Sequence, residues 1–244
     1  MRCARSLLSW ILIAASMGVH ADDAAEVQRN LIDAQLARMA GEVGDAGNSA
    51  GRVFFLGFAG YGEERVFAEE IKLAAQRVGE KYGSTARTVL LLNDRRDLST
   101  YPFASESSLR YSLRALARVM NPDEDVLFLV LSSHGSKGAT ISVSNEGMTP
   151  QQLGAATLAQ LLGESGIRWK VIVVSACFSG AFVEPLADNH TIVITAASRH
   201  RTSFGCSDTR HLTYFGEAFF QDALPISAHL RDAFESARRE IRVR

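Results

Sequence analysis

Two short segments of the sequence end in residues that could act together as a nucleophile and a base. The segment VIVVSACFSG (171–180) is a β-branched run that leads to Cys177, and small residues follow it. The segment VLFLVLSSHGSKG (126–138) is a similar apolar run that leads to His134. A thiol becomes a nucleophile near neutral pH when a base or a positive charge lies beside it, and a histidine can be that base. The two segments therefore predict one site built on a Cys–His pair.

Small residues around the pair fit the same chemistry. Gly135 follows the histidine, and Ser179 and Gly180 follow the cysteine. Small side chains let a substrate backbone approach closely. The N–H groups of Gly135 and Cys177 could then hold a developing oxyanion. A buried structural thiol and an unrelated loop histidine are the alternative, but the matched positions and the glycine context favour catalysis.

Both segments belong to a regular alternation of predicted strands and helices. Continuous apolar runs, typical of buried strands, occupy 52–60, 88–94, 125–135, 169–177 and 191–198. Amphipathic patterns predict helices at 63–83, 105–120, 149–166, 211–224 and 226–242, and 139–148 resembles a small hairpin. The alternation predicts an α/β fold in which a mostly parallel sheet lies between two layers of helices. This is a three-layer α/β/α sandwich. In such sheets, sites collect at the carboxyl ends of strands, where His134 and Cys177 fall.

The N-terminus has the pattern of an export signal. Two arginines precede an apolar stretch, which ends at VHA (19–21), a small-x-small cleavage pattern. We expect residues 1–21 to be a cleaved signal peptide of a periplasmic or secreted protein, with an uncleaved anchor as the alternative. Residues 22–51 are expected to form a helix and a Gly-rich linker, and residues 52–244 the compact domain. No later stretch approaches the roughly 18 uninterrupted apolar residues typical of a membrane span.

Composition and motifs exclude several other functions. The 244 residues are 47% hydrophobic and carry a net charge of −1, which argues against a nucleic-acid partner. Neither a nucleotide-binding glycine motif nor HExxH or CxxC occurs, so the sequence implies no cofactor and no metal. After signal cleavage Cys177 and Cys206 remain, and in an oxidising compartment a disulfide between them is an alternative to a free nucleophile.

The ordered motifs resemble the legumain (asparaginyl endopeptidase) family of cysteine peptidases. The carrying motifs are strand-Ser-His-Gly at His134 and strand-Ala-Cys-x-Ser-Gly at Cys177. The similarity continues in ITAASRHRTSFGCSDTRHLTYFGEAFF (194–220) and FAGYGEERVFAEE (58–70), so that it covers residues 52–222. The resemblance implies a caspase-like fold and a cysteine-type endopeptidase. By this resemblance Cys177 is the nucleophile and His134 the general base.

The resemblance also assigns binding roles. Gly135 would be the backbone donor of the oxyanion hole. The family's asparagine-selective pocket would use the arginine Arg65, the acidic residue Glu217, and a serine at or beside Thr202 and Ser203.

Two positions depart from the family pattern. Where the family usually has an acidic residue two before the cysteine, this chain has Ser175, which removes one charge from the pocket floor. Where the family has an asparagine that orients the histidine, Glu63 lies nearby, and we expect its carboxylate to accept the second N–H of His134. Cys206 matches a non-catalytic cysteine of the family and is expected to be structural.

The sequence therefore predicts an exported cysteine endopeptidase that acts on peptide or protein substrates. A transpeptidase or transamidase with the same thioester chemistry is one alternative. A catalytically silent peptide-binding domain is the other, and a Cys177–Cys206 disulfide would be its sign.

Overall fold

Five parallel strands form the centre of the molecule. The computed structural model describes residues 23–39, 51–145, 149–203, 205 and 210–243; the predicted signal peptide, most of the linker and Cys206 lie outside them. The strands are β1 (Val53–Ala59), β2 (Thr88–Leu92), β3 (Val126–Ser132), β7 (Trp169–Ser175) and β8 (Thr191–Thr195). Their order in the sheet is β2-β1-β3-β7-β8, and all neighbours are parallel. Each strand lies within one of the five runs predicted from the sequence.

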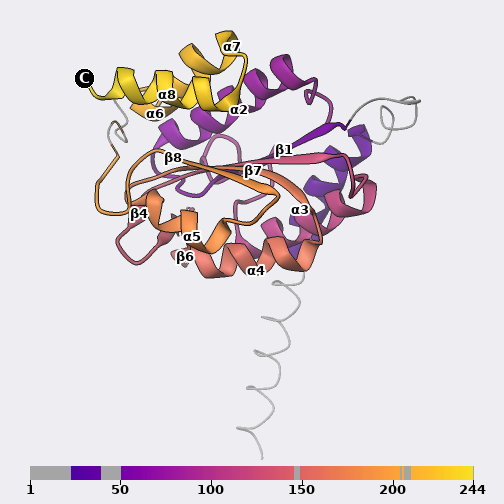
Figure 1. Cartoon of the computed structure of the whole chain (residues 1–244). Coiled ribbons are helices and arrows are strands. Elements are labelled where there is room, and N and C mark those ends of the chain that lie inside the picture. Colours follow the sequence, from indigo (N-terminus) through magenta and orange to yellow (C-terminus); the bar gives the residue numbers. More distant parts are fainter. Residues whose placement is uncertain (1–22, 40–50, 146–148, 204, 206–209, 244) are drawn as a thin grey trace, which may run out of the picture.

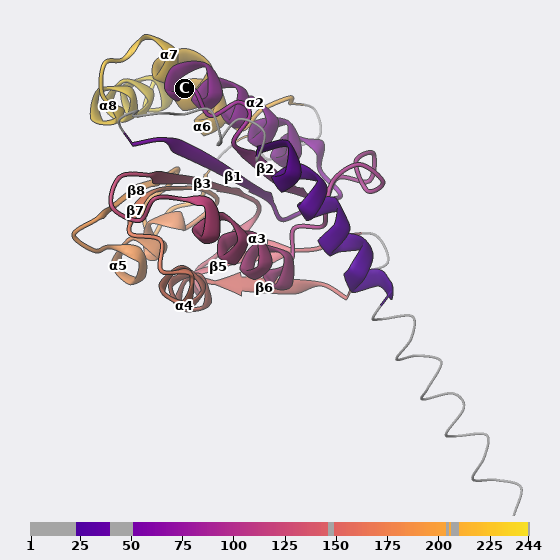
Figure 2. The same cartoon turned by 90° about the vertical axis from the view of Figure 1, so that its right-hand side faces the viewer.

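Helices cover both faces of this sheet (Figures 1 and 2). One face carries α2 (Arg65–Tyr82), α6 (Tyr214–Gly216), the π-helical segment η2 (Glu217–Ala223), α7 (Leu224–Ile226) and α8 (Leu230–Ile241). The other face carries α3 (Glu106–Val119), α4 (Ala155–Ser165) and α5 (Val183–Leu186). The predicted three-layer α/β/α sandwich is therefore confirmed.

The central strands β1, β3 and β7 are largely apolar because each buries both of its faces. Along β3, Leu127, Leu129 and Leu131 enter the core that includes α3 and α4, and Phe128 and Val130 enter the core that includes α2 and α8. Side chains alternate between the two faces of a strand, so two cores require a continuous apolar run instead of an alternating one. This packing orients β3 and β7 and fixes where their carboxyl ends lie.

A small antiparallel sheet follows the end of β3. It contains β4 (Gly135–Ser136), β5 (Thr140–Val143) and β6 (Gln151–Gly154). The hairpin predicted at 139–148 has its first strand in β5, but the helix predicted from residue 149 starts only at Ala155. Residues 151–154 instead pair with β5, and this pairing delays the start of α4.

The two edges of the main sheet differ. At the β2 edge, a helix at residues 23–39 packs through Ile32 and Met39. Its Gln35 side chain accepts a hydrogen bond from Leu90 N (2.9 Å) and donates one to Leu90 O (3.1 Å), so that it takes the place of a neighbouring strand. The helical part of the predicted 22–51 segment thus belongs to the folded body.

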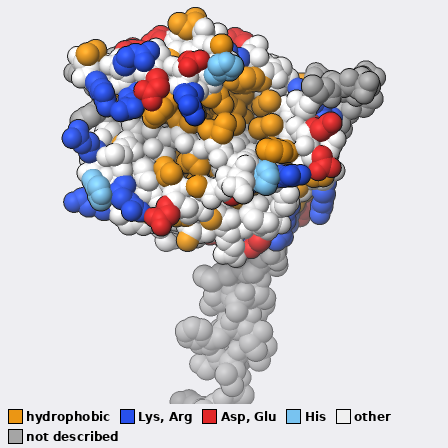
Figure 3. Space-filling model, in the orientation of Figure 1, with side chains coloured by type: hydrophobic (Ala, Val, Ile, Leu, Met, Phe, Trp, Pro, Cys, Tyr) orange, Lys and Arg blue, Asp and Glu red, His pale blue; other side chains and the backbone are white. Residues whose placement is uncertain are grey.

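The opposite edge, β8, faces the viewer in Figure 3, where hydrophobic side chains gather between the upper helices and the sheet. Ile192 of β8 is 51% exposed. A cavity of about 300 Å³ lies between the end of β8 and α8, with Ala196, Phe234 and Ile241 in its wall. Within the described part of the chain, no helix is both long enough and apolar enough to cross a membrane.

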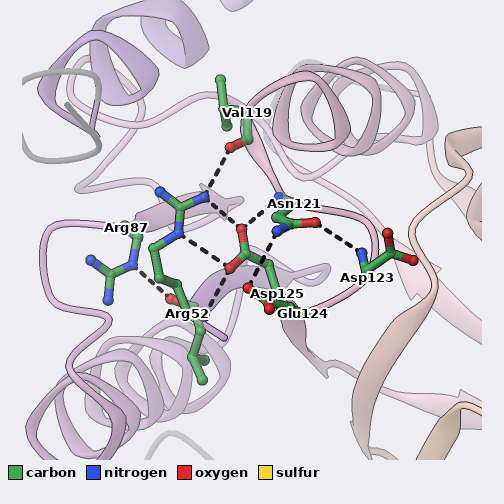
Figure 4. Close-up of polar contacts among 8 residues, drawn as sticks. Arg52, Arg87, Val119, Asn121, Asp123, Glu124 and Asp125 are labelled. Atoms are coloured by element: carbon green, nitrogen blue, oxygen red, sulfur yellow. Dashed lines mark hydrogen bonds and ion pairs between the residues drawn. The ribbon is translucent and has the colours of Figure 1, made fainter. Parts of the chain in front are cut away.

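The amino end of β3 is held by an ion pair between a buried aspartate and a partly buried arginine (Figure 4). Asp125, which directly precedes β3, lies 2.6 Å from Nη2 of Arg52. It also accepts bonds from the backbone N–H groups of Arg52 (2.8 Å) and Asn121 (2.6 Å). These contacts join the start of β1, the end of the α3 loop and the start of β3 at one point.

Candidate active site

The register of β3 and β7 brings the predicted nucleophile and base to one edge of the sheet. Ser132, the last residue of β3, pairs with Ser175, the last residue of β7. The pairing extends one step further, since Ser133 N donates to Ser175 O at 3.2 Å. His134 and Cys177 each lie two residues beyond this aligned pair. They therefore leave the sheet at the same level on neighbouring strands.

The backbone of Gly135 packs directly against that of Cys177. A Cβ atom at position 135 would lie 2.0 Å from the carbonyl oxygen of Cys177, a distance that real atoms do not tolerate. A residue without a side chain is thus required there. The close approach fixes the segment after the histidine against the segment that carries the cysteine.

Cys177 is a free, half-buried thiol. Its Sγ accepts a hydrogen bond from the backbone N–H of Ser203 at 3.3 Å, which is a donor that a negative charge on sulfur would strengthen. The disulfide alternative would need Cys206, which lies outside the described residues. The thiol also contacts the carbonyl oxygen of Ser203 at 3.7 Å, so both backbone polar groups of Ser203 face the sulfur.

The turn after Cys177 has an unusual backbone conformation. Phe178 has a φ of +55°, in the left-handed region that bulky residues rarely adopt. The turn is held by Phe178 N, which donates to Arg201 O at 2.8 Å, and by Gly180 N, which donates to Ala197 O at 2.9 Å. Such conformations persist only where the surroundings enforce them, and they cluster at functional sites.

Two aromatic rings and a carboxylate surround His134. Its ring meets Tyr61 (centroids 4.7 Å apart) and Phe67 (5.0 Å) in edge-to-face contacts. Its Nε2 lies 3.1 Å from Oε2 of Glu64. These three contacts hold the plane of the imidazole ring.

The carboxylate beside His134 belongs to Glu64, and the expectation that Glu63 takes this place is wrong. Glu64 is the N-cap residue of α2 and has an extended backbone, so its side chain leaves the helix end in the direction of the histidine. Glu63 is exposed and accepts a hydrogen bond from the Tyr61 hydroxyl at 3.2 Å. Glu63 lies in a bend before the extended Glu64, so the two neighbouring carboxylates have different partners.

Of the predicted pocket residues, only Ser203 has a described contact with Cys177. Ser203 contacts Cys177 through its backbone, and Thr202 beside it is exposed. Arg65 is the exposed first residue of α2. Glu217 forms an ion pair with Arg210 (2.5 Å), a partner that sequence reasoning missed.

A basic groove opens beside the cysteine turn. It has a volume of about 660 Å³, and Lys137, Arg199 and His200 contribute to its lining. The Lys137 ammonium lies 5.9 Å from the centre of the Phe178 ring. The groove therefore lies next to the strained turn.

Ser175 is 2% exposed, and the buried carboxyl group of Glu70 faces it. The sequence predicted the loss of a charge at this position, but a carboxyl group enters it from α2. Glu70 was not among the residues singled out from the sequence. The signal was present: Glu70 lies four residues after Val66 and four before Ala74, on the buried stripe of that helix.

Comparisons with known proteins identify the family of the chain. The sequence model of the Peptidase C13 family matches residues 110–244, which include both His134 and Cys177. A search of curated proteins found no match. Among solved structures, the chain is similar to a secreted C11 cysteine protease from Bacteroides thetaiotaomicron, solved in complex with an irreversible peptide inhibitor. That similarity has 15% identity and a TM-score of 0.45, and it covers 77% of this chain and 56% of that chain.

The family match extends over more than half of the sequence and includes both strand ends that carry the candidate nucleophile and base. The resemblance to the legumain family is thereby confirmed, and the chain belongs to the Peptidase C13 family of cysteine peptidases.

Proposed function

We propose that this protein is an exported cysteine endopeptidase that cleaves peptide bonds through Cys177 and His134. The observation that carries the proposal is the alignment of the two residues, each two positions beyond the paired ends of β3 and β7. In an open parallel sheet, this edge is where catalytic groups converge. Membership of the Peptidase C13 family supports the same reaction class.

His134 acts as the base through the nitrogen that Glu64 leaves available. Glu64 Oε2 lies 3.1 Å from Nε2. At this distance the carboxylate can accept a hydrogen bond from Nε2–H, and this favours the tautomer in which Nδ1 carries the lone pair. Nδ1 takes the proton of the Cys177 thiol, and Glu64 stabilises the imidazolium that results. The contacts with Tyr61 and Phe67 keep the ring in this orientation.

The thiolate of Cys177 then attacks the carbonyl carbon of the scissile bond. The negative charge moves to the carbonyl oxygen, which the N–H groups of Gly135 and Cys177 stabilise. Gly135 suits this role because Ser142 N bonds to His134 O (2.9 Å). This bond makes His134–Ser142 a hydrogen-bonded pair. Hydrogen-bonded and non-hydrogen-bonded pairs alternate along an antiparallel ladder, so the next pair, Gly135–Ile141, is not hydrogen-bonded, and the Gly135 N–H points away from β5.

The oxyanion collapses and the C–N bond breaks. The imidazolium of His134 gives its proton to the leaving amine, and the acyl group remains on Cys177 as a thioester. Water, deprotonated by His134, attacks the thioester and releases the acid and the free thiol. An amine in place of water would give a transpeptidase product, so product analysis separates the two reactions.

The test is covalent labelling of the purified protein with peptide-like electrophiles that carry Asn, Asp or Arg. We expect one adduct per chain on the wild type, none on Cys177→Ala, and slow labelling of His134→Ala. His229→Ala is the matched control, because His229 is an exposed residue that precedes α8, and it should label like the wild type. Equal labelling of the wild type and Cys177→Ala would overturn the proposal, and peptide cleavage measured alongside would identify the preferred residue.

A further inference from the structure

Glu70 is a completely buried carboxyl group at the edge of the sheet where the candidate active site lies. It belongs to α2 and is 0% exposed. Its Oε2 accepts hydrogen bonds from the Thr213 hydroxyl (2.7 Å) and the Ser132 hydroxyl (3.2 Å). Helix residues in such a position are usually apolar, and a buried carboxyl group costs free energy unless its surroundings compensate for it.

A third hydroxyl faces the same carboxyl group. The Ser175 hydroxyl lowers the pKa of Glu70, although neither Ser175 Oγ nor Glu70 Oε1 lies within the bonding geometry of a partner. The backbone also closes around the group, since a Cβ atom at Gly216 would lie 2.8 Å from Glu70 Cδ. The carboxyl group therefore fills the space between four segments of the chain.

Each of these contacts belongs to a segment that carries a candidate functional residue. Ser132 ends β3 two residues before His134, and Ser175 ends β7 two residues before Cys177. Thr213 caps α6, and its hydroxyl accepts a bond from Gly216 N at 2.9 Å. Glu70 thereby links both strand ends to the start of α6.

We propose that Glu70 is a positioning residue of the active site, whose buried carboxyl group holds the ends of β3 and β7 and the start of α6 in the arrangement that brings His134 and Cys177 together. The proposal rests on the function proposed above. It assigns no contact with substrate to Glu70, which acts through the two strand ends.

The charge state of Glu70 follows from its surroundings. Burial raises its pKa to about 7, and the hydroxyls of Ser175, Thr213 and Ser132 oppose the rise. Among the charged or titratable groups on the elements around it are Arg65, Glu69 and Lys72 of α2, His134 after β3, Cys177 after β7, and Tyr214 and Glu217 at α6. None of these is among the groups that shift its pKa, so the described contacts of Glu70 provide hydroxyls and no cation. The neutral carboxyl group suits this site, because Oε1–H can donate to Ser175 Oγ, whereas an ionised one would be a buried charge without a counter-ion.

The test compares Glu70→Ala and Glu70→Gln with the wild type. The matched control is Glu69→Ala, because Glu69 is the adjacent residue on α2 but is partly exposed and contacts Arg96 (3.2 Å). Two readouts are taken: the alkylation rate of Cys177 by chloroacetamide, mapped to the peptide, and the kcat and KM of peptide cleavage. Alkylation of Cys177 requires no peptidase activity, so the two readouts can be separated. If the substitutions change the alkylation rate as expected but the wild type cleaves no peptide, the proposed function is wrong, and the effect of Glu70 on Cys177 has still been measured.

We expect Glu70→Ala to slow Cys177 alkylation and to lower kcat on the order of tenfold to a hundredfold with little change in KM, because small misplacements of reacting groups have effects of this size. Glu69→Ala should match the wild type. Glu70→Gln keeps the size of a neutral carboxyl group and should match the wild type at about pH 5.5. At higher pH the ratio of wild-type to Glu70→Gln rates should fall, with a midpoint at about 7.

The ratio isolates Glu70, because the ionisations of His134 and Cys177 are common to both proteins. A ratio that is constant from about pH 5.5 to 8.5, or a Glu70→Ala rate equal to that of Glu69→Ala, would overturn the proposal. If Glu70→Ala fails to fold, Ser132→Ala takes its place. This variant removes one hydrogen bond to the carboxyl group and should have a smaller effect in the same direction, and a wild-type rate would again overturn the proposal.

Discussion

A buried carboxyl group lies at each end of strand β3, and the two groups have opposite surroundings. At the amino end, Asp125 accepts bonds from the backbone and the guanidinium of Arg52 and from Asn121 N (Figure 4). At the carboxyl end, Glu70 has hydroxyl contacts and one oxygen without a bonded partner. Burial acts to raise the pKa of both. At Asp125 the bonds from Arg52 and Asn121 outweigh it and lower the pKa, whereas at Glu70 burial prevails.

This difference separates the end of the sheet that stabilises the fold from the end that carries the proposed active site. Buried polar groups in native proteins are normally satisfied, as Asp125 is. At the carboxyl end, Glu70 and Ser175 each have a buried oxygen without a bonded partner, and Phe178 has a strained backbone. Strain and unsatisfied groups cost stability and are retained where function needs a particular arrangement. Substitutions at the amino end should therefore change stability alone, and substitutions at the carboxyl end should change activity as well.

The largest expected effect is that of Asp125→Asn. The substitution removes the charge opposite Arg52, whose side chain is only 17% exposed, and loss of one partner of a buried pair costs about 3–5 kcal/mol. We expect a loss of about 3 kcal/mol in the free energy of unfolding, measured by urea denaturation. The alkylation rate of Cys177 in the folded protein should not change.

Asp123→Asn is the control for this prediction. Asp123 lies in the same loop, but its side chain is 79% exposed and pairs with Arg168 at 3.4 Å. Exposed pairs contribute about 0–1 kcal/mol, so this variant should denature close to the wild type. If both variants denature alike, the amino end does not have the stabilising role that its contacts indicate.

At the other end, Glu70→Gln should increase stability, by an amount that grows as the pH rises from about 4.5 to about 7. The pKa of Glu70 is raised from 4.5 to about 7 in the folded protein, so between these values the folded state binds a proton that the unfolded state has lost. Stability therefore falls as the pH rises from about 4.5 to about 7 and then stays level. A shift of this size corresponds to about 3 kcal/mol, which the neutral glutamine side chain avoids.

The measurement is urea denaturation of the wild type and Glu70→Gln at about pH 5 and pH 8.5. The two proteins should be similar at the lower pH, and Glu70→Gln should be the more stable at the higher pH by up to about 3 kcal/mol. Asp125 cannot produce this trend. Its lowered pKa means that its contribution is lost only as the pH falls below about 4. A stability difference independent of pH would mean that Glu70 is already ionised at the lower pH, and the contrast between the two carboxyl groups would disappear.

The arrangement of strands could be predicted from the sequence because it depends on local, repeated patterns. Five continuous apolar runs indicated five buried strands, and the order in which His134 and Cys177 follow two of them indicated a shared edge. The register of β3 and β7 then follows from packing, which no short motif encodes. The small sheet was predicted only in part, because β6 pairs with a strand that lies across an intervening loop.

The residues that support the site could not be identified in the same way. Glu64 and Glu63 are equivalent in sequence, and only the extended backbone before α2 decides which one reaches His134. Ser203 was predicted as a pocket residue for its side chain, but it contacts Cys177 through its backbone N–H. To identify Glu70 from the sequence, one would have had to recognise that a charged residue lies on the buried face of its helix. In each case the missing information is the direction of an atom, which depends on tertiary structure.

The smallest expected change in stability, and the sharpest difference between stability and activity, comes from Gly135→Ala. Its Cβ atom would lie 2.0 Å from the backbone oxygen of Cys177, so one of the two segments must move. Overpacking of this kind costs about 1–3 kcal/mol, and the same movement displaces the proposed oxyanion donor from the nucleophile. Peptide cleavage should therefore fall by two orders of magnitude or more, on the order of the loss of an oxyanion donor.

Gly138→Ala is the matched control in the same hairpin, since its Cβ atom would meet only Ser136 Oγ at 3.5 Å, and it should cleave like the wild type. If Gly135→Ala loses stability but keeps its activity, the carboxyl end of the sheet is held together here by packing alone, and its difference from the amino end is one of degree.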